Sequence, residues 1–238
     1  MGWTTKEMEI INIEKAIRAE IYQPFACYRE PLVMSGFITS LPLPPPTTIA
    51  GMLVHAMDNK FEDWIDISVI GKASTFMVDY QRLVKDPETY HMKGIHEPSP
   101  AKIQVLIDVH LSVFIKAGNP EDVLSALNEP KNYLSLGRKE DTAFVKEAEL
   151  VEIKTIRVSL KEAIKNDIIL ENTYIPFVEE YDIGYYYRLP KRYKTLDRRE
   201  FEFGDYSYIS DKSKFIHGNF CIYEINNSRE IFRWMATY

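Results

Sequence analysis

The segment from Ile103 to Ile115 limits the fold of this chain more strictly than any other stretch of its sequence. All seven odd-numbered positions carry isoleucine, valine or leucine, whereas four of the six even-numbered positions carry polar residues. Side chains of a β-strand point alternately to its two faces, so this pattern predicts a strand with one buried face. The polar residues also exclude a membrane-spanning helix, which needs about 20 apolar residues in succession.

Three further strands are predicted around this one, at residues 14–28, 69–80 and 149–158. In the first of them the side chains expected to face the core are Ile17, Ala19, Ile21 and Phe25. The connection at residues 81–102 is long and polar, and three prolines and one glycine interrupt it. Because connections of this length are usually functional, it is predicted to be a protruding arm.

Two helices are predicted from their apolar spacing and their start signals. The first follows the prolines at 44–46, with Thr47 or Thr48 as its capping residue. Its apolar residues recur at helical spacing: Ile49, Met52, Leu53, Ala56 and Met57. The second helix is predicted to begin at Pro120, with Asn119 as its cap.

The order of these elements, β-α-β-β-α-β, predicts an α+β fold. Residues 1–158 are expected to form a ferredoxin-like (RRM-like) sandwich, with the arm at about 81–102 as a protruding β-hairpin. Residues 159–238 contain alternating stretches rich in tyrosine and phenylalanine, which predict a small C-terminal β-rich domain. Ser159 and Glu162 fit a capping box for a short helix at its start.

Positive charge is concentrated in one short segment. The chain has a net charge of −6, but residues 188–199 contain six basic residues and one acidic residue. A negative total argues against nonspecific coating of nucleic acid, which needs summed positive potential. The segment alternates rings and cations, which favours either single-stranded nucleic acid or docking on an acidic subunit. Its candidate RNA contacts are Arg188, Lys191 and Arg192.

Several classes of function are excluded by the motifs that the sequence lacks. It has no phosphate-loop, dinucleotide-binding, zinc-protease or serine-hydrolase motif, so neither a cofactor nor a metal is expected. Its two cysteines, Cys27 and Cys221, form no CxxC pair and indicate no disulfide framework. The sequence shows no signal peptide and no membrane span, so the expected location is the cytoplasm.

Two motifs resemble those of the CRISPR-associated Cas-five family, a branch of the RAMP superfamily. The first is FACYREPLVMSGFITSLPLPPPTTIAGML, from Phe25 to Leu53, in which prolines and threonines open a helix. The second is YLSLGRKED, from Tyr133 to Asp141, a leucine-glycine-arginine turn followed by a base and two acids. The resemblance covers roughly the first 155 residues.

The resemblance implies a non-catalytic subunit of a type I CRISPR interference complex (Cascade). Such a subunit binds the 5′ handle of the CRISPR RNA and caps the filament of backbone subunits. The implied partners are the CRISPR RNA, the backbone-forming and large subunits and, indirectly, the target DNA. In that family the arm acts as a thumb over the guide, which corresponds here to residues 81–102. The subtype of the complex stays open, with an I-B-like complex as one option.

The motifs and the arm supply further candidate RNA contacts. These are Arg29, Thr47, Thr48, Gly51, Lys93, Gly137, Arg138 and Lys139. The Arg29 guanidinium can clamp a phosphate or read a base edge. The start of the first helix offers N–H groups to a phosphate, and a helix start packed on the sheet is the alternative. For the turn at Gly137 the alternative is a salt-bridged bend, because Glu140 and Asp141 follow it.

A second hypothesis is metal-independent cleavage of CRISPR repeat RNA. This chemistry needs a base for the 2′-hydroxyl and an acid for the leaving oxygen. The arm contains the densest cluster of such groups: Tyr90, His91, Lys93 and His96. Solvated residues of a binding thumb are the other interpretation of this cluster. His55 and His110 fall on polar faces of their elements, where exposure or contact with a partner is expected.

Overall fold

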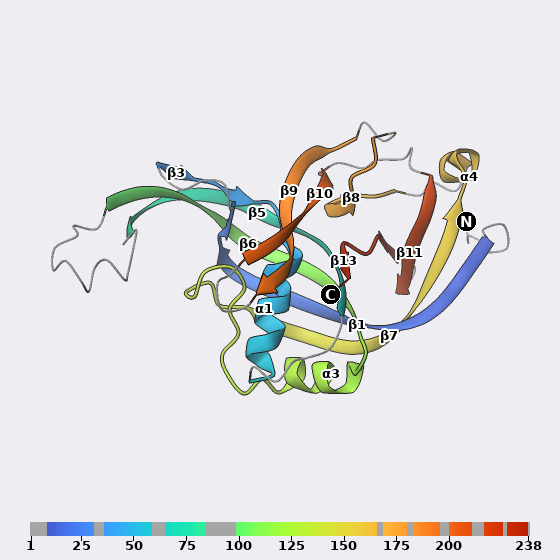
Figure 1. The fold of residues 1–238 in the computed structure, drawn as a ribbon, viewed down its shortest axis with the longest axis horizontal. Coiled ribbons are helices and arrows are strands. Elements are labelled where there is room, and N and C mark those ends of the chain that lie inside the picture. Colours follow the sequence, from blue (N-terminus) through green and yellow to red (C-terminus); the bar gives the residue numbers. More distant parts are fainter. Residues whose placement is uncertain are drawn as a thin grey trace.

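In the computed structural model an antiparallel β-sheet forms most of the protein, and helices are few (Figure 1). The structure describes residues 9–30, 36–58, 65–83, 99–165, 169–179, 183–195, 200–210, 217–225 and 228–237. Within these ranges no helix is long and apolar enough to span a membrane.

Four long strands form the centre of the sheet. They are β1 (Glu9–Ala26), β5 (Ile65–Leu83), β6 (Ser99–Ala117) and β7 (Phe144–Val158). They lie in the order β7-β1-β6-β5, and each neighbouring pair is antiparallel. Helix α1 (Pro46–Ala56) lies between β1 and β5 in the chain, and α3 (Pro120–Asn128) lies between β6 and β7. The four predicted strands and the two predicted helices are therefore confirmed, and each strand is longer than predicted.

Shorter strands extend the sheet on both sides. Beyond β5 lie β8 (Thr173–Pro176), β10 (Glu200–Ile209) and β9 (Tyr185–Thr195), and beyond β7 lie β11 (Gly218–Ile225) and β12 (Ser228–Phe232). At its margins β3 (Phe37–Ile38) pairs with β6, and β13 (Ala236–Thr237) pairs with β5. A separate small sheet consists of β2 (Tyr28–Arg29) and β4 (Ser40–Leu41). Strands from both sides of residue 158 share the large sheet, and the predicted division into two domains stays a prediction.

The largest core lies between the large sheet and helices α1 and α3. Ile17 and Val113 of the sheet pack there with Leu53 of α1 and Val123 of α3. A second buried cluster joins the opposite face of the sheet to β11 and β12: Ala16, Phe114, Val151, Ile153, Cys221 and Phe232. That opposite face is covered only in part, since His110 on β6 is exposed.

For one of the four residues of β1 that were predicted to face the core, the prediction is wrong. The other three are buried, but Phe25 is 52% exposed. The cause is an interruption of the β1–β6 pairing at Pro24 and Asp108, where Asp108 has a φ of 56° and Pro24 has no N–H for the ladder, although the register is the same on both sides. Beyond this point the two faces are exchanged, so Leu106 joins the helix-side core while Ile107 is half-buried.

β5 and β6 continue as a two-stranded ribbon that reaches away from the body of the protein (Figure 1). The pairing extends to Leu83 on β5 and Ser99 on β6. The ribbon coincides with both ends of the predicted arm, whose residues 84–98 lie outside the described ranges. It carries the exposed side chains Phe76, Met77, Val78 and Tyr80.

The helix starts agree with the predictions to different degrees. In α1 the N-cap is Pro45, whose carbonyl accepts from the N–H of Thr48 at 3.0 Å, so the predicted threonine cap is wrong. In α3 the N-cap is Asn119 as predicted, but its side chain donates to Asp122 at 2.6 Å. The capping box of α4 (Leu160–Lys165) is confirmed by reciprocal hydrogen bonds between Ser159 and Glu162, at 2.8 and 3.3 Å.

Candidate nucleic-acid interface

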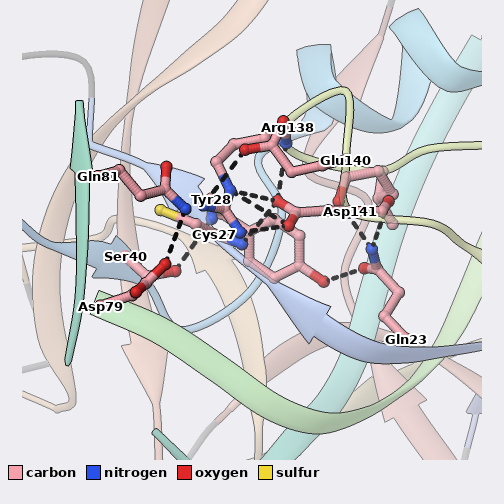
Figure 2. A network of polar contacts seen from close by, with 10 residues as sticks. Gln23, Cys27, Tyr28, Ser40, Asp79, Gln81, Arg138, Glu140 and Asp141 are labelled. Atoms are coloured by element: carbon pink, nitrogen blue, oxygen red, sulfur yellow. Dashed lines mark hydrogen bonds and ion pairs between the residues drawn. The ribbon is translucent and has the colours of Figure 1, made fainter. Parts of the chain in front are cut away.

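A buried polar network joins the two sequence segments that carry the motifs (Figure 2). At its centre lies the Asp141 carboxylate, which is 1% exposed and accepts from the backbone N–H of Cys27 at 2.9 Å. It also accepts from the backbone N–H of Arg138 at 2.9 Å and from Nη2 of that residue at 2.6 Å. Cys27 and Asp141 are 114 positions apart in the chain. The two motifs therefore form one structural unit.

Gln23 and Tyr28 complete the network on the side of β1. Gln23 Nε2 donates to the carbonyls of Leu136 at 2.8 Å and Asp141 at 3.2 Å. The Tyr28 hydroxyl donates to Gln23 Oε1 at 2.5 Å. Burial raises the pKa of Tyr28 well above the usual tyrosine value, so its hydroxyl remains a donor at neutral pH. Three hydrogen bonds thus hold the buried Gln23 amide in one orientation.

The bend from Leu136 to Asp141 requires glycine at position 137. Gly137 has a φ of +112°, and an added Cβ would lie 2.9 Å from the carbonyl oxygen of Cys27. Two backbone hydrogen bonds of 3.0 Å close the bend, from Leu136 N to Asp141 O and from Asp141 N to Arg138 O. A side chain at position 137 would strain the backbone and push the bend away from β1.

Arg138 is paired within the protein. Its side chain is 19% exposed and forms ion pairs with Asp141 at 2.6 Å and with Glu140 at 3.4 Å. Burial by itself lowers the pKa of Arg138, but the hydrogen bond and charge of Asp141 outweigh it, so the pKa is raised. The salt-bridged bend is therefore the observed arrangement, and RNA contact by Arg138 stays a prediction.

Two other cations at this network are exposed. Arg29 directly follows Tyr28, and its backbone pairs with Ser40 of β4. Lys139 lies within the bend, next to Arg138. Both side chains are open to solvent, so an anionic ligand can approach them without a change in the buried network.

The proline elbow at residues 44–46 is buried, and so is Thr47, at 2% exposure. Strand β9 covers it: the Thr47 hydroxyl donates to the Pro190 carbonyl at 3.3 Å, and the Tyr193 hydroxyl donates to the Thr47 carbonyl at 3.5 Å. The packed helix start is therefore observed, and this burial argues against the predicted RNA contact of Thr47. Thr48 is half-buried. At Gly51 an added Cβ would lie 3.5 Å from the Tyr193 hydroxyl, which is ordinary contact. The segment that lies next to Gly51 is therefore β9 of the same chain.

Strand β9 carries the basic segment past this elbow. Arg188 and Lys194 are exposed, whereas Lys191 and Arg192 are half-buried. Arg192 forms an ion pair with Glu202 of β10 at 3.0 Å. Burial, with a contribution from the charge of Glu30, raises the pKa of Tyr187 on β9.

The candidate residues of the arm lie outside the described ranges: Tyr90, His91, Lys93 and His96. Their roles in binding or cleavage stay predictions. Across the part of the chain that the structure describes, no group of three or more His, Cys, Asp or Glu side chains is arranged to hold a metal ion.

Sequence reasoning missed Gln23 and Tyr28. A signal existed for Gln23, because it continues the inward-facing alternation of β1 as a polar residue, and buried amides need partners. For Asp141 the salt-bridged bend was one of the two interpretations, and its ion pair with Arg138 is observed. Neither pattern identifies Cys27 as the residue to which the bend attaches.

The chain is similar to known proteins in its sequence and in its fold. A family model described as "CRISPR-associated protein (Cas_Cas5)", the Cas-five family, matches residues 16–205. A chain of a "CRISPR RNA-guided surveillance complex" is 14% identical with a TM-score of 0.52, over 84% of this chain and 90% of that one. A CRISPR protein from Archaeoglobus fulgidus is 12% identical with a TM-score of 0.50, over 92% of this chain and 100% of that one. At these identities the two structures show a shared fold. No curated protein sequence matches the chain.

Proposed function

Because this chain belongs to the Cas5 family of CRISPR-associated proteins, we propose that it is a non-catalytic subunit of a type I CRISPR interference complex. In this role it binds the 5′ handle of the CRISPR RNA and caps the filament of backbone subunits. The observation that carries the proposal is the Asp141 network, which fixes the two motifs together and leaves Arg29 and Lys139 exposed at its edge.

The proposed RNA contacts are the cations that solvent reaches around this network and on β9. Arg29, Lys139, Arg188 and Lys191 neutralise phosphates, and Lys93 adds a contact from the arm. Arg138 acts indirectly, because its pairing with Asp141 holds the bend that presents Lys139. These exposed or half-buried cations belong to a chain whose net charge is −6, which suits a specific RNA site better than general coating.

The architecture suits this role. The strand order β7-β1-β6-β5, with a helix in each crossover, supports the proposal of a ferredoxin-like sandwich. The ribbon of β5 and β6 is the thumb that lies over the guide between handle and spacer. The backbone-forming and large subunits are the neighbouring proteins, and the target DNA is met through the guide.

The test is binding of the full chain to single-stranded RNA that carries the CRISPR repeat encoded beside its gene. Anisotropy titrations at several salt concentrations should show that the affinity falls with salt. The logarithm of the association constant should decrease with the logarithm of the salt concentration, with a slope of about 0.7 for each phosphate contact. The double variant Arg29→Ala, Lys139→Ala should bind about tenfold more weakly. Arg157→Ala on β7, a cation that is 62% exposed, is the matched control and should bind as the wild type does. Equal binding by all three proteins would refute the assigned contacts.

The same RNA tests the cleavage hypothesis. Incubation with the wild-type chain in EDTA is expected to leave the RNA intact, because the proposed role needs no chemistry. A discrete product would contradict the non-catalytic assignment. Its loss in His91→Ala or His96→Ala would then assign the activity to the arm.

A further inference from the structure

A row of side chains crosses four strands on the sheet face opposite α1 and α3. Tyr22 of β1 is paired with Phe144 of β7 and with His110 of β6, and His110 is paired with Lys72 of β5. Successive residues of a strand point to opposite faces, and the next residue of β1, Gln23, is buried on the helix side. The three rings therefore share the more open face of the sheet.

The rings of this row are close to one another and accessible. The Tyr22 centroid lies 5.1 Å from that of His110 and 6.4 Å from that of Phe144, to which it is stacked. Phe144 is 50% exposed, and the His110 side chain is 52% exposed. Exposed aromatic faces in a continuous row are the arrangement on which unpaired bases stack.

Two lysines accompany the rings. Lys146 lies 4.7 Å from the centroid of Tyr22, because a bulge in β7 places it between the residues that pair with Glu20 and Ile21. Lys72 continues the row on β5 and is exposed. Positive charge thus flanks the rings at two points, as the phosphates beside a stacked base require.

An open depression of about 420 Å³ adjoins the row. Its lining includes the cations Lys72, Lys146 and Arg18 and the carboxylates Glu20, Glu171 and Glu230. Arg18 is 5% exposed and bonds Glu230 at 2.7 Å and Glu20 at 2.8 Å, while its Nη1 has no hydrogen-bond partner among the described residues. Charges of both signs therefore line the depression, and its volume is within the roughly 300–1,000 Å³ of small-ligand sites.

We infer that this face binds one or two unpaired nucleotides of single-stranded RNA. The bases stack on Tyr22, His110 and Phe144, and the phosphates meet Lys72 and Lys146. The inference rests on the proposed function in taking RNA as the ligand, but it uses none of the cations assigned to the handle. It adds a second RNA contact on the more open face of the sheet.

The experiment is photo-crosslinking of the full chain to repeat RNA containing 4-thiouridine, with peptide mapping of the adducts. Adducts are expected on Tyr22, His110 or Phe144. The double variant His110→Ala, Phe144→Ala should lose these adducts and bind about tenfold more weakly. Lys72→Gln with Lys146→Gln should weaken binding without removing a ring. Phe177→Ala removes a ring that is 40% exposed outside both motifs and should change nothing.

The outcomes separate this inference from the proposed function. Adducts confined to the segments around Arg29 and Arg188, with unchanged affinity in the ring variant, would refute the inference and leave the proposed function in place. Absence of RNA binding by the wild-type chain, alone and in the reconstituted complex, would refute both. Thermal melting of each variant identifies any that lose binding through misfolding, and the lysine variant then decides.

Discussion

The bend at residues 136–141 and strand β9 both contain basic residues, yet Arg138 of the bend and the exposed cations of β9 have opposite roles. In the bend, Arg138 is turned inward and paired with Asp141 at 2.6 Å, and the carboxylate is buried. On β9, Arg188 and Lys194 are exposed, and Arg192 pairs with Glu202 on the neighbouring strand. One region uses charge to hold the protein together, and the other presents charge to solvent.

The difference shows that a basic motif does not by itself identify a ligand contact. A buried ion pair is costly to break because the remaining charge is left without solvent or partner. An exposed cation can exchange water for a phosphate at little cost to stability. We therefore expect the buried pair of Arg138 and Asp141 to control folding and the exposed cations of β9 to contribute to RNA affinity, and substitutions at the two places separate these effects.

The largest effect is expected from Asp141→Asn. The substitution leaves the partly buried Arg138 guanidinium without its carboxylate, which should lower the free energy of unfolding by about 3–5 kcal/mol. The melting temperature should then fall by roughly 10 °C, measured by circular dichroism. Glu140→Gln removes the neighbouring acid, which is 59% exposed, and should change stability by less than about 0.5 kcal/mol. Equal melting of both variants would show that the bend is not an anchor.

Smaller effects on stability are expected at two glycines, and the two effects have opposite signs. Gly137→Ala should destabilise the protein by about 1–3 kcal/mol, because φ is +112° there and the Cβ would meet the Cys27 carbonyl at 2.9 Å. Gly51→Ala lies in α1 with only ordinary contact at 3.5 Å and should stabilise it by about 0.5–1 kcal/mol. Urea unfolding measures both. A destabilising Gly51→Ala would mean that α1 is held more tightly by β9 than its contacts indicate.

Alkaline pH tests the burial of Cys27, the residue to which the bend attaches. Burial raises the pKa of the Cys27 thiol from its ordinary value of 9.0 to about 11. The unfolded chain therefore loses this proton at lower pH than the folded chain does, and stability should fall as pH rises from 9 towards 11. At pH 10 the ionisation of this one thiol in the unfolded chain should lower the free energy of unfolding by about 1 kcal/mol. The loss of stability between pH 8 and pH 10 should be smaller by that amount in Cys27→Ala, and an unchanged loss would contradict the assignment.

The smallest effect on stability is expected on β9. Arg188→Gln with Lys191→Gln should leave the free energy of unfolding within about 0.5 kcal/mol of the wild type. The same variant should bind repeat RNA more weakly, with a salt slope reduced by about 0.7 for each phosphate contact that is lost. A large fall in stability with unchanged affinity would reverse the roles assigned to the two regions.

The strands and helices could be predicted from the sequence because they follow from local alternation and spacing. The alternation at Ile103 to Ile115 identified β6, and the pair Ser159 and Glu162 identified the capping box of α4. The exchange of faces beyond Asp108 could not be predicted, because it arises at one residue with a φ of 56° that lies opposite Pro24 of the partner strand. Local pattern carries no information on where the alternation of a strand is interrupted.

The segments that form the candidate site could be predicted from the sequence, but the contacts between them could not. The two motifs were recognised separately, whereas the attachment of the bend to Cys27 is a contact between distant positions. For the same reason the burial of Thr47 under Pro190 of β9 could not be foreseen from the helix start alone. The ring row depends on cross-strand register, which places Tyr22 between His110 and Phe144.

The long sequence separation within the Asp141 network has a consequence for biosynthesis. Gln23 and Leu136 are 113 positions apart, so at about 5–20 residues per second the ribosome needs roughly 6–20 s to add the second partner after the first. Until then Nε2 of Gln23 and the backbone N–H of Cys27 lack the partners that they have in the folded protein. A nascent chain therefore completes this network late, and a product terminated before Leu136 carries the first motif without its anchor.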